Sequence, residues 1–330
     1  MIQTKGLSRQ FGPTVAVESL DLDVREGELV ALLGPNGAGK TTTVRILSGL
    51  IAPTSGEAKV GGYRIGAESH QVRRIVGLLT ETPGLYEKLS AVANLEFFGR
   101  LYDVPPADLR ARMRRYLELL GLWERRDEAV GGYSRGMKQK LAIVRALLHD
   151  PRVIFLDEPA NGLDPESART VREFITELRR AGRTILLCTH NLDEADRLCD
   201  RVAIVKGRLI DIGTPAELRR RLYGHHVRVE LRNPFPALAE AARDLPFVRG
   251  ARYEDHSLVV ELADPPEETP ALVRALVGAG AEIQSVGEVR ASLEEVYLDL
   301  VRRDGEQNGR EQDGRVGNGR VGNGRDGGAR

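Results

Sequence analysis

Short apolar runs alternate with amphipathic stretches along the first two-thirds of the chain. LVALLG, RIVGLLT, RVIFLDEP and RTILLCTH are continuous apolar runs of strand length, and the stretches between them repeat apolar residues at helical spacing. This alternation is typical of a largely parallel sheet with connecting helices. We therefore predict an α/β domain over residues 1–224.

The strand-like runs stop between about residues 82 and 150. LSAVANLEFFGRLYDV, ADLRARMRRYLELLGLW and GMKQKLAIVRALLHD all carry apolar residues at helical spacing. We predict a helical subdomain inserted into the first domain.

A different order of elements begins at residue 225. HVRVEL, FPALAEAARDL, FVRGARYED, SLVVELAD, TPALVRALVGAG and AEIQSVGEV read as strand, helix, strand, strand, helix, strand, and the helix SLEEVYLDLVRR follows. This order predicts a small ferredoxin-like α+β domain over residues 225–303. His225 and His226 are adjacent without further metal ligands nearby in sequence, so a dimerising or regulatory role is favoured over ligand binding.

The segment 304–330 has almost no apolar side chains and is predicted to be disordered, because it cannot bury enough surface to offset its ordering entropy. Acidic residues balance its arginines, which favours a solvated tail over a nucleic-acid arm. The arginines recur every five residues, at Arg310, Arg315, Arg320, Arg325 and Arg330.

Composition narrows the class of protein further. The 330 residues carry a formal net charge of +0, so no global field draws the chain to nucleic acid or to an anionic membrane. No apolar run approaches the roughly 20 residues needed to span a bilayer. Cys188 and Cys199 form no disulfide framework and are expected to be reduced packing residues. We expect a soluble, cytosolic protein.

The strongest chemical signal is the run GPNGAGKTT, which fits G-x-x-x-x-G-K-[ST] between a predicted strand and a predicted helix. Its backbone N–H groups are expected to surround phosphate oxygens, with Lys40 on the β- and γ-phosphates and the Thr41 hydroxyl on Mg²⁺. The predicted nucleotide-binding residues here are Gly34, Pro35, Asn36, Gly37, Ala38, Gly39, Lys40, Thr41 and Thr42.

The run RVIFLDEP supplies the second half of this site. An apolar strand brings Asp157 to its carboxyl end, where the carboxylate is expected to hold Mg²⁺ through water. Glu158, the next residue, is placed to orient or deprotonate the attacking water. ATP and Mg²⁺ are the predicted cofactors.

Between these motifs, GGYSRGMKQKLAIVRAL resembles the signature motif of the ABC ATPase family. The resemblance implies a P-loop cassette with a mostly parallel core, an antiparallel β edge and a helical subdomain. Ser134 and Gly136 offer a hydroxyl and an N–H at a helix start, which makes a second anion site. In the family, ATP lies between the P-loop of one subunit and the signature of the other, which implies a dimer, expected to be a homodimer.

The resemblance assigns roles to more residues. Phe11 occupies the position that stacks on adenine, NGLDP places Leu163 and Asp164 at the dimer seam, and His190 occupies the switch position that contacts the γ-phosphate. Two positions depart from the family pattern. Glu81 stands at the position where the family usually places the Q-loop glutamine, and its carboxylate is expected still to bind Mg²⁺ while changing the local charge. Met137 replaces a polar residue of the signature.

The YSRGMKQK form and the appended small domain resemble the exporter branch that serves type-2 permeases. This resemblance implies a permease on a separate chain, export of a drug, antibiotic, lipid, polysaccharide or ion, and a location at the inner face of the membrane. The alternative is an ABC ATPase of DNA repair or translation. It is disfavoured because the interval between the motifs lacks a long coiled coil and only one P-loop is present.

Overall fold

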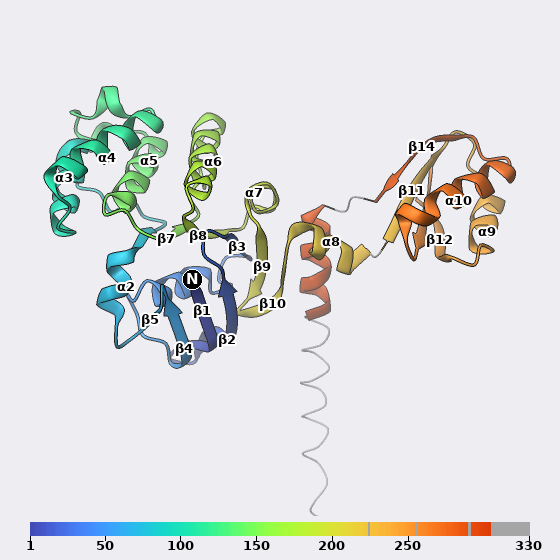
Figure 1. The fold of residues 1–330 in the computed structure, drawn as a ribbon, viewed down its shortest axis with the longest axis horizontal. Helices are drawn as coiled ribbons and strands as arrows, with labels where there is room; N and C mark the ends of the chain where they lie inside the picture. The colour runs from blue at the N-terminus through green and yellow to red at the C-terminus, as the bar shows by residue number, and fades with distance from the viewer. Residues whose placement is uncertain (224, 255, 290–291, 305–330) are drawn as a thin grey trace, which may run out of the picture. The chain divides into compact units, whose positions relative to one another are not determined.

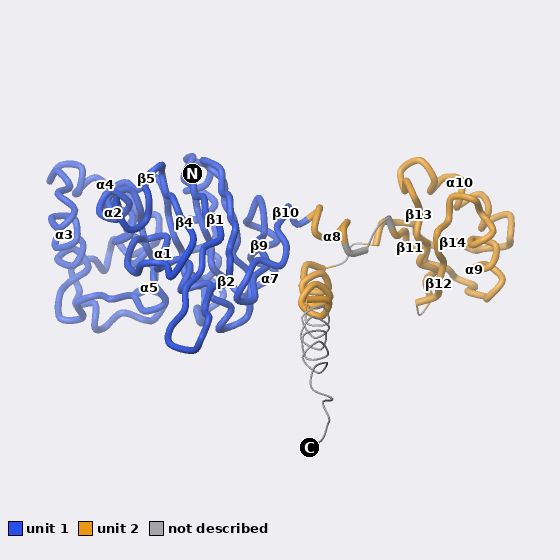
Figure 2. The backbone as a smooth tube through the Cα atoms, turned by 90° about the horizontal axis from the view of Figure 1, so that it is seen from below, with its two compact units in different colours: residues 1–215 blue, residues 216–330 orange. Residues whose placement is uncertain are grey.

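The computed structural model describes residues 1–304 except 224, 255, 290 and 291. The chain divides into two compact units, Met1–Pro215 and Ala216–Arg330, shown in blue and orange in Figure 2. This division comes earlier than the expected boundary at residue 224. The predicted disordered tail, 304–330, lies outside the described residues apart from Asp304.

Unit 1 is built around a six-stranded sheet in the order β10-β9-β3-β8-β7-β6 (Figure 1). Only the β10–β9 pair is antiparallel, and every residue of the three strands at its centre, β3, β8 and β7, is buried. Burial on both faces explains why these strands are continuously apolar. The predicted largely parallel sheet is confirmed. Its strands are β3 (Leu29–Leu33), β6 (Val76–Leu79), β7 (Val153–Asp157), β8 (Thr184–Thr189), β9 (Arg201–Lys206) and β10 (Arg208–Gly213).

A smaller antiparallel sheet, in the order β2-β1-β4-β5, forms the predicted β edge. Its inward residues share one hydrophobic cluster with the helix after β3 and with the central sheet. The elements are β1 (Ile2–Phe11), β2 (Thr14–Val24), α1 (Lys40–Leu47), β4 (Ser55–Val60), β5 (Tyr63–Arg64) and α2 (Ser69–Ile75).

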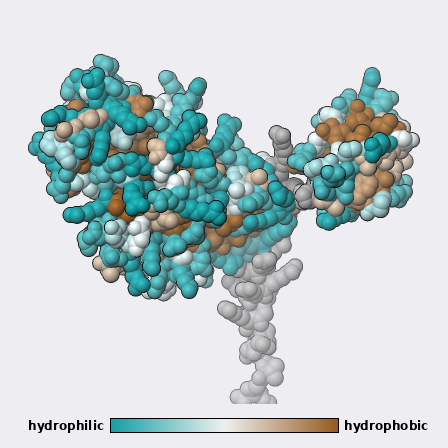
Figure 3. Space-filling view, in the orientation of Figure 1, coloured by the Kyte–Doolittle hydropathy of each residue, from teal (hydrophilic) through white to brown (hydrophobic). Residues whose placement is uncertain are grey.

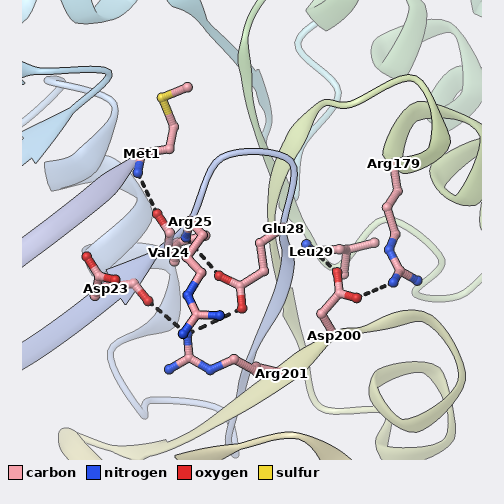
Figure 4. A network of polar contacts seen from close by, with 9 residues as sticks. All are labelled: Met1, Asp23, Val24, Arg25, Glu28, Leu29, Arg179, Asp200 and Arg201. Carbon is pink, nitrogen blue, oxygen red and sulfur yellow. Dashed lines mark hydrogen bonds and ion pairs between the residues drawn. The ribbon is translucent and has the colours of Figure 1, made fainter.

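Charged residues hold the start of β3 in place (Figure 4). The Glu28 carboxylate accepts a hydrogen bond from the Arg25 N–H at 2.8 Å and pairs with Arg201 at 3.3 Å. Asp200 accepts from the Leu29 N–H at 2.9 Å and also pairs with Arg179. The start of β3, the strand that leads into GPNGAGKTT, is therefore held by Arg201 of β9 and by Asp200, the residue before β9.

The region between β6 and β7 is helical, as predicted, and α5 packs against α3, α4 and the later helix α6. Ser90 and Ser134 begin their helices as side-chain caps, which satisfies N–H groups that have no partner within the helix. The helices of unit 1 beyond β6 are α3 (Ala91–Leu101), α4 (Pro106–Leu119), η1 (Trp123–Arg125), η2 (Val130–Gly132), α5 (Arg135–Leu147), α6 (Pro165–Arg180) and α7 (Leu192–Leu198).

Unit 2 has the predicted βαββαβ order, with an antiparallel sheet in the order β12-β13-β11-β14. One face of this sheet buries a separate apolar core under two helices, and residues 293–304 form the closing helix. No helix in the described part of the chain is long and apolar enough to cross a membrane. The elements are α8 (Pro215–Tyr223), β11 (His225–Leu231), α9 (Pro236–Arg243), β12 (Val248–Glu254), β13 (Ser257–Leu262), α10 (Pro265–Gly278) and β14 (Ile283–Glu288).

Candidate active site

Three glycines allow the loop between β3 and α1 to close tightly over the sheet. A Cβ on Gly34 would lie 2.3 Å from the Val205 carbonyl oxygen, and a Cβ on Gly39 would lie 2.3 Å from the Ala16 carbonyl oxygen. Gly37 and Gly39 also adopt φ of 83° and 90°, which side chains rarely adopt. Contact therefore requires glycine at position 34, conformation requires it at position 37, and both require it at position 39.

Helix α1 begins at this loop with its first N–H groups available to an anion. Its N-cap is Gly39, no side chain caps it, and its first turn contains no acidic residue. The partial positive charge of the helix N-terminus is thus not offset by a protein carboxylate in that turn. Lys40, whose side chain is buried, donates from Nζ to the carbonyls of Gly34 at 2.6 Å and Pro35 at 3.2 Å.

Asp157 ends β7 beside the start of α1. Burial raises the pKa of its carboxyl group, a hydrogen bond from the Thr41 hydroxyl lowers it, and the charges of Glu158 and Glu81 raise it again. The structure therefore brings Thr41 and Asp157 into contact, two oxygen donors from motifs far apart in the sequence. Glu81 follows β6, is exposed, and acts on this site through its charge.

Glu158 lies between Lys40 and His190. Its Oε1 atom is 3.5 Å from Lys40 Nζ and 2.9 Å from His190 Nδ1. Glu158 has φ of 52°, a strained value for a residue with a side chain, and its N–H donates to the Cys188 carbonyl at 2.9 Å. That bond joins the ends of β7 and β8 and directs the carboxylate into the site, where it is only 12% exposed.

Ser134, Gly136 and Asp164 form a second cluster where two helices begin. The Ser134 hydroxyl accepts from the Met137 N–H at 3.2 Å, and Asp164 caps α6 by accepting from the Ser167 N–H at 2.9 Å, which lowers the Asp164 pKa. A Cβ on Gly136 would lie 2.8 Å from Ser167 Oγ, so the two helix starts are in close contact. Within the described residues, no hydrogen bond or ion pair connects this cluster to Lys40, Glu158 or His190.

Phe11 is the last residue of β1. The residue is 46% exposed, and the Arg9 guanidinium lies 4.5 Å from the ring centroid. An exposed aromatic face is suited to stacking on a base, so its role at adenine stays a prediction.

Comparison with known proteins identifies the family. An ABC transporter model matches residues 17–161, and a model described as "ATP-binding protein DrrA1-3-like, C-terminal domain" matches residues 213–301. The chain is 38% identical to the daunorubicin resistance ATP-binding protein DrrA3 of Streptomyces coeruleorubidus, over 92% of this chain and 96% of that protein. The chain belongs to the ABC transporter ATP-binding proteins.

This ABC ATP-binding subunit binds and hydrolyses ATP. Its match to an ABC transporter model and, over 92% of the chain, to a drug-resistance ATP-binding protein sets aside the alternative of a repair or translation factor. It is also 31% identical to the linearmycin resistance ATP-binding protein LnrL of Bacillus subtilis, over 92% of this chain and 99% of that protein. The ATP-binding cassette MJ0796, solved as a dimer in a post-hydrolysis state with ADP and Pi, is 25% identical with a TM-score of 0.60, over 65% of this chain and 98% of that chain.

Two polar residues near the site of this ABC subunit were not foreseen from the sequence. Arg145, on α5, donates to the carbonyls of Pro83 and Gly84 in the loop after β6. Glu194, in the first turn of α7, is buried behind His190. The spacing of Asn191 and Glu194 is that of a helix-capping pair, and this spacing is the feature of the sequence that points to a structural role for Glu194. That spacing alone does not show that the glutamate is buried.

Proposed function

We propose that this subunit drives export of a drug-like or antibiotic compound through a separate membrane permease, and that it hydrolyses ATP in a dimer with two shared sites. The observation that carries the proposal is the separation of two clusters in one chain. Lys40, Glu158 and His190 form one cluster, while Ser134 and Gly136 present a second anion-binding helix start elsewhere. In the ABC family, ATP lies between the P-loop of one subunit and the signature of the other, so we infer that the second group comes from another copy of the chain.

The substrate class is inferred from the relatives. The two proteins compared above are named for resistance to daunorubicin and to linearmycin. Both matches extend through unit 2, so the resemblance includes the accessory domain as well as the cassette. Export of an antibiotic or similar compound, from a position at the inner face of the membrane, is the function that these relatives support best.

Mg²⁺ fits the oxygen donors at the start of α1. Thr41 and Asp157 would hold the ion, since Mg²⁺ favours one or two protein oxygens together with water and substrate phosphates. Within the described residues, no group of three or more His, Cys, Asp or Glu side chains could hold a metal ion alone. The bound ion would balance negative charge on the β- and γ-phosphates.

The chain's own residues supply the remaining chemistry. Glu158 orients the attacking water and accepts its proton, and Lys40 balances the charge that develops on the phosphate. His190 presents the ring edge opposite its contact with Glu158 to the γ-phosphate. The partner's signature helix adds its N–H groups on the other side of the nucleotide.

Assembly on ATP tests this proposal. We expect the Glu158→Gln variant to be monomeric without nucleotide and dimeric with Mg-ATP, and wild-type turnover to rise more than linearly with protein concentration. Light scattering and a phosphate-release assay measure the two quantities. A monomeric variant in saturating ATP, together with strictly linear wild-type turnover, would contradict the shared site.

An exposed aromatic cluster is suited to contact the permease. Tyr86, Phe97 and Phe98 pack ring to ring with centroids 5.2 to 6.0 Å apart, and Tyr86 and Phe97 are 50% and 46% exposed. Figure 3 shows apolar surface among hydrophilic atoms in the region of α3 and α4. Because large exposed aromatic groups commonly mark contact sites, we assign this cluster to an apolar segment of the permease.

Arg145 connects the aromatic cluster to the ATP site. Its guanidinium lies 5.0 Å from the Phe98 ring centroid and donates to the carbonyls of Pro83 at 2.6 Å and Gly84 at 2.7 Å. Arg145 belongs to α5, the helix that begins after Ser134, and Gly84 follows Glu81 in the loop after β6. A shift of the aromatic cluster would therefore reach both the signature helix and the edge of the ATP site.

Phe97→Ser should separate coupling from hydrolysis. We expect basal ATPase activity of the isolated subunit to stay within about twofold of wild type, because Phe97 lies on the surface. Stimulation by membranes that contain the co-expressed permease should fall at least about fivefold, as expected for loss of an aromatic contact worth about 1 kcal/mol or more. Leu119→Ser, which changes a residue 42% exposed on α4, is the matched control and should retain stimulation. Equal stimulation of both variants would contradict the assignment.

A further inference from the structure

Behind His190 lies a buried carboxylate that the hydrolytic mechanism does not use. Glu194 is only 3% exposed, and its Oε2 atom accepts a hydrogen bond from the Thr189 hydroxyl at 2.9 Å. Its Oε1 atom has no hydrogen-bond partner within the described residues. Burial raises the pKa of Glu194. A buried and half-satisfied carboxylate costs free energy, so its presence beside an active site calls for a physical reason.

The hydrogen bonds of Glu194 enclose the backbone of His190. Thr189, the last residue of β8, donates its hydroxyl proton to Glu194 and accepts from the Asn191 N–H at 3.0 Å. The Asn191 side chain in turn accepts from the Glu194 N–H at 3.0 Å. His190 lies between Thr189 and Asn191, so the residues on both of its sides are held by one ring of hydrogen bonds.

This arrangement differs from an ordinary capping box. In that motif the carboxylate at the third helical position bonds directly to the N–H of the capping residue. Here the Thr189 hydroxyl stands between Glu194 and the Asn191 N–H. The inserted hydroxyl ties the start of α7 to the end of β8, across the residue whose side chain enters the active site.

We infer that Thr189 and Glu194 are positioning residues that fix the His190 backbone, so that the imidazole keeps its contact with Glu158. The inference rests on the proposed role of His190 at the γ-phosphate. The His190 side chain is 50% exposed and its Nδ1 atom lies 2.9 Å from Glu158 Oε1. An exposed ring receives little orientation from packing, so its direction depends on where the backbone holds Cα and Cβ.

Thr189→Val tests the inference, because valine keeps the shape of threonine and removes the hydroxyl. We expect kcat to fall about 10- to 100-fold with little change in KM for ATP, since a misplacement of about 1 Å can cost this much in a catalytic step. Thr189→Ser retains the hydroxyl and should keep kcat within about threefold of wild type. The folded fraction of each variant is measured by circular dichroism at the assay temperature, so that loss of stability is not counted as loss of turnover.

A role limited to capping α7 makes a different prediction. Thr189→Val would then lower Tm, while kcat of the folded protein would match that of Thr189→Ser, and this result would overturn the inference.

If Thr189→Val does not fold, Glu194→Gln provides the second test. Glutamine can still accept the Thr189 hydroxyl proton through its amide oxygen, so kcat should stay within about tenfold of wild type, whereas Glu194→Leu should fall at least about tenfold below Glu194→Gln. Equal kcat for these two variants would also overturn it.

His190→Ala distinguishes failure of this inference from failure of the proposed function. A large loss of kcat in His190→Ala together with wild-type kcat in Thr189→Val would remove only the positioning role. Wild-type kcat in His190→Ala would remove the role of His190 itself and the positioning role with it.

Discussion

Glu158→Gln is expected to lower kcat for ATP hydrolysis by about 10²- to 10⁴-fold, the usual contribution of a positioned general base. The Glu158 carboxylate lies 2.9 Å from His190 and 3.5 Å from Lys40, at the end of the buried strand β7. Glutamine has nearly the same shape but cannot accept the proton of the attacking water. The loop glycines and the start of α1 are unchanged, so ATP affinity should be preserved.

Single-turnover phosphate release and nucleotide titration measure the two quantities for this variant. Glu173→Gln is the matched control, because Glu173 is an exposed acid on α6 that pairs with Arg169. It should keep wild-type kcat. Turnover of Glu158→Gln equal to that of this control would remove Glu158 as the general base.

Mixing Lys40→Met with Gly136→Asp is expected to restore activity that neither variant has alone. Lys40→Met removes the ammonium group that we propose binds the β- and γ-phosphates. Gly136→Asp places a negative charge in the first turn of α5, where it stabilises the helix but repels phosphate oxygens. It must also displace Ser167, whose Oγ would lie 2.8 Å from the new Cβ.

The amount of restored activity follows from the pairing of the chains. A mixed dimer has one site with both defects and one site with neither. Random pairing of equal amounts makes half of the dimers mixed, so about a quarter of wild-type turnover is expected if each intact site works alone. Phosphate release by the mixture is compared with the sum of the separate variants. Activity no greater than that sum, while both variants remain folded, would place Lys40 and Gly136 in the same site of one chain.

Local patterns in the sequence were sufficient to predict the elements and the position of the glycine-rich loop between β3 and α1. The apolar runs that became β3, β7 and β8 are continuous because these strands are buried on both faces. The glycines of GPNGAGKTT suit a loop that curls tightly: Gly37 and Gly39 adopt positive φ, and Gly34 and Gly39 lie too close to neighbouring carbonyls to carry a side chain. The βαββαβ order of unit 2 was also readable, because its strands and helices differ in period.

Contacts between distant motifs could not be predicted from those patterns. Lys40, Glu158 and His190 meet because β3, β8 and β7 are neighbours in the sheet, an order that differs from their order along the chain. Glu158 has a positive φ where the end of β7 bonds to β8, and this conformation directs its carboxylate into the site. The sequence around Glu158 does not reveal this conformation. Asp164 was predicted at a dimer seam, and the structure adds that it caps α6 beside Gly136.

The sequence by itself determined where the strands and helices occur, which loop can surround a phosphate, and which acids stand at the end of an apolar strand, because these depend on neighbouring residues and on a short period. Only the tertiary structure decided that Glu158 lies between Lys40 and His190, that Arg145 joins the loop after β6 to an aromatic surface, and that Glu194 is buried behind His190. Each of these depends on packing between segments remote in sequence, and burial and hydrogen bonding are set by that packing rather than by the local run of residues.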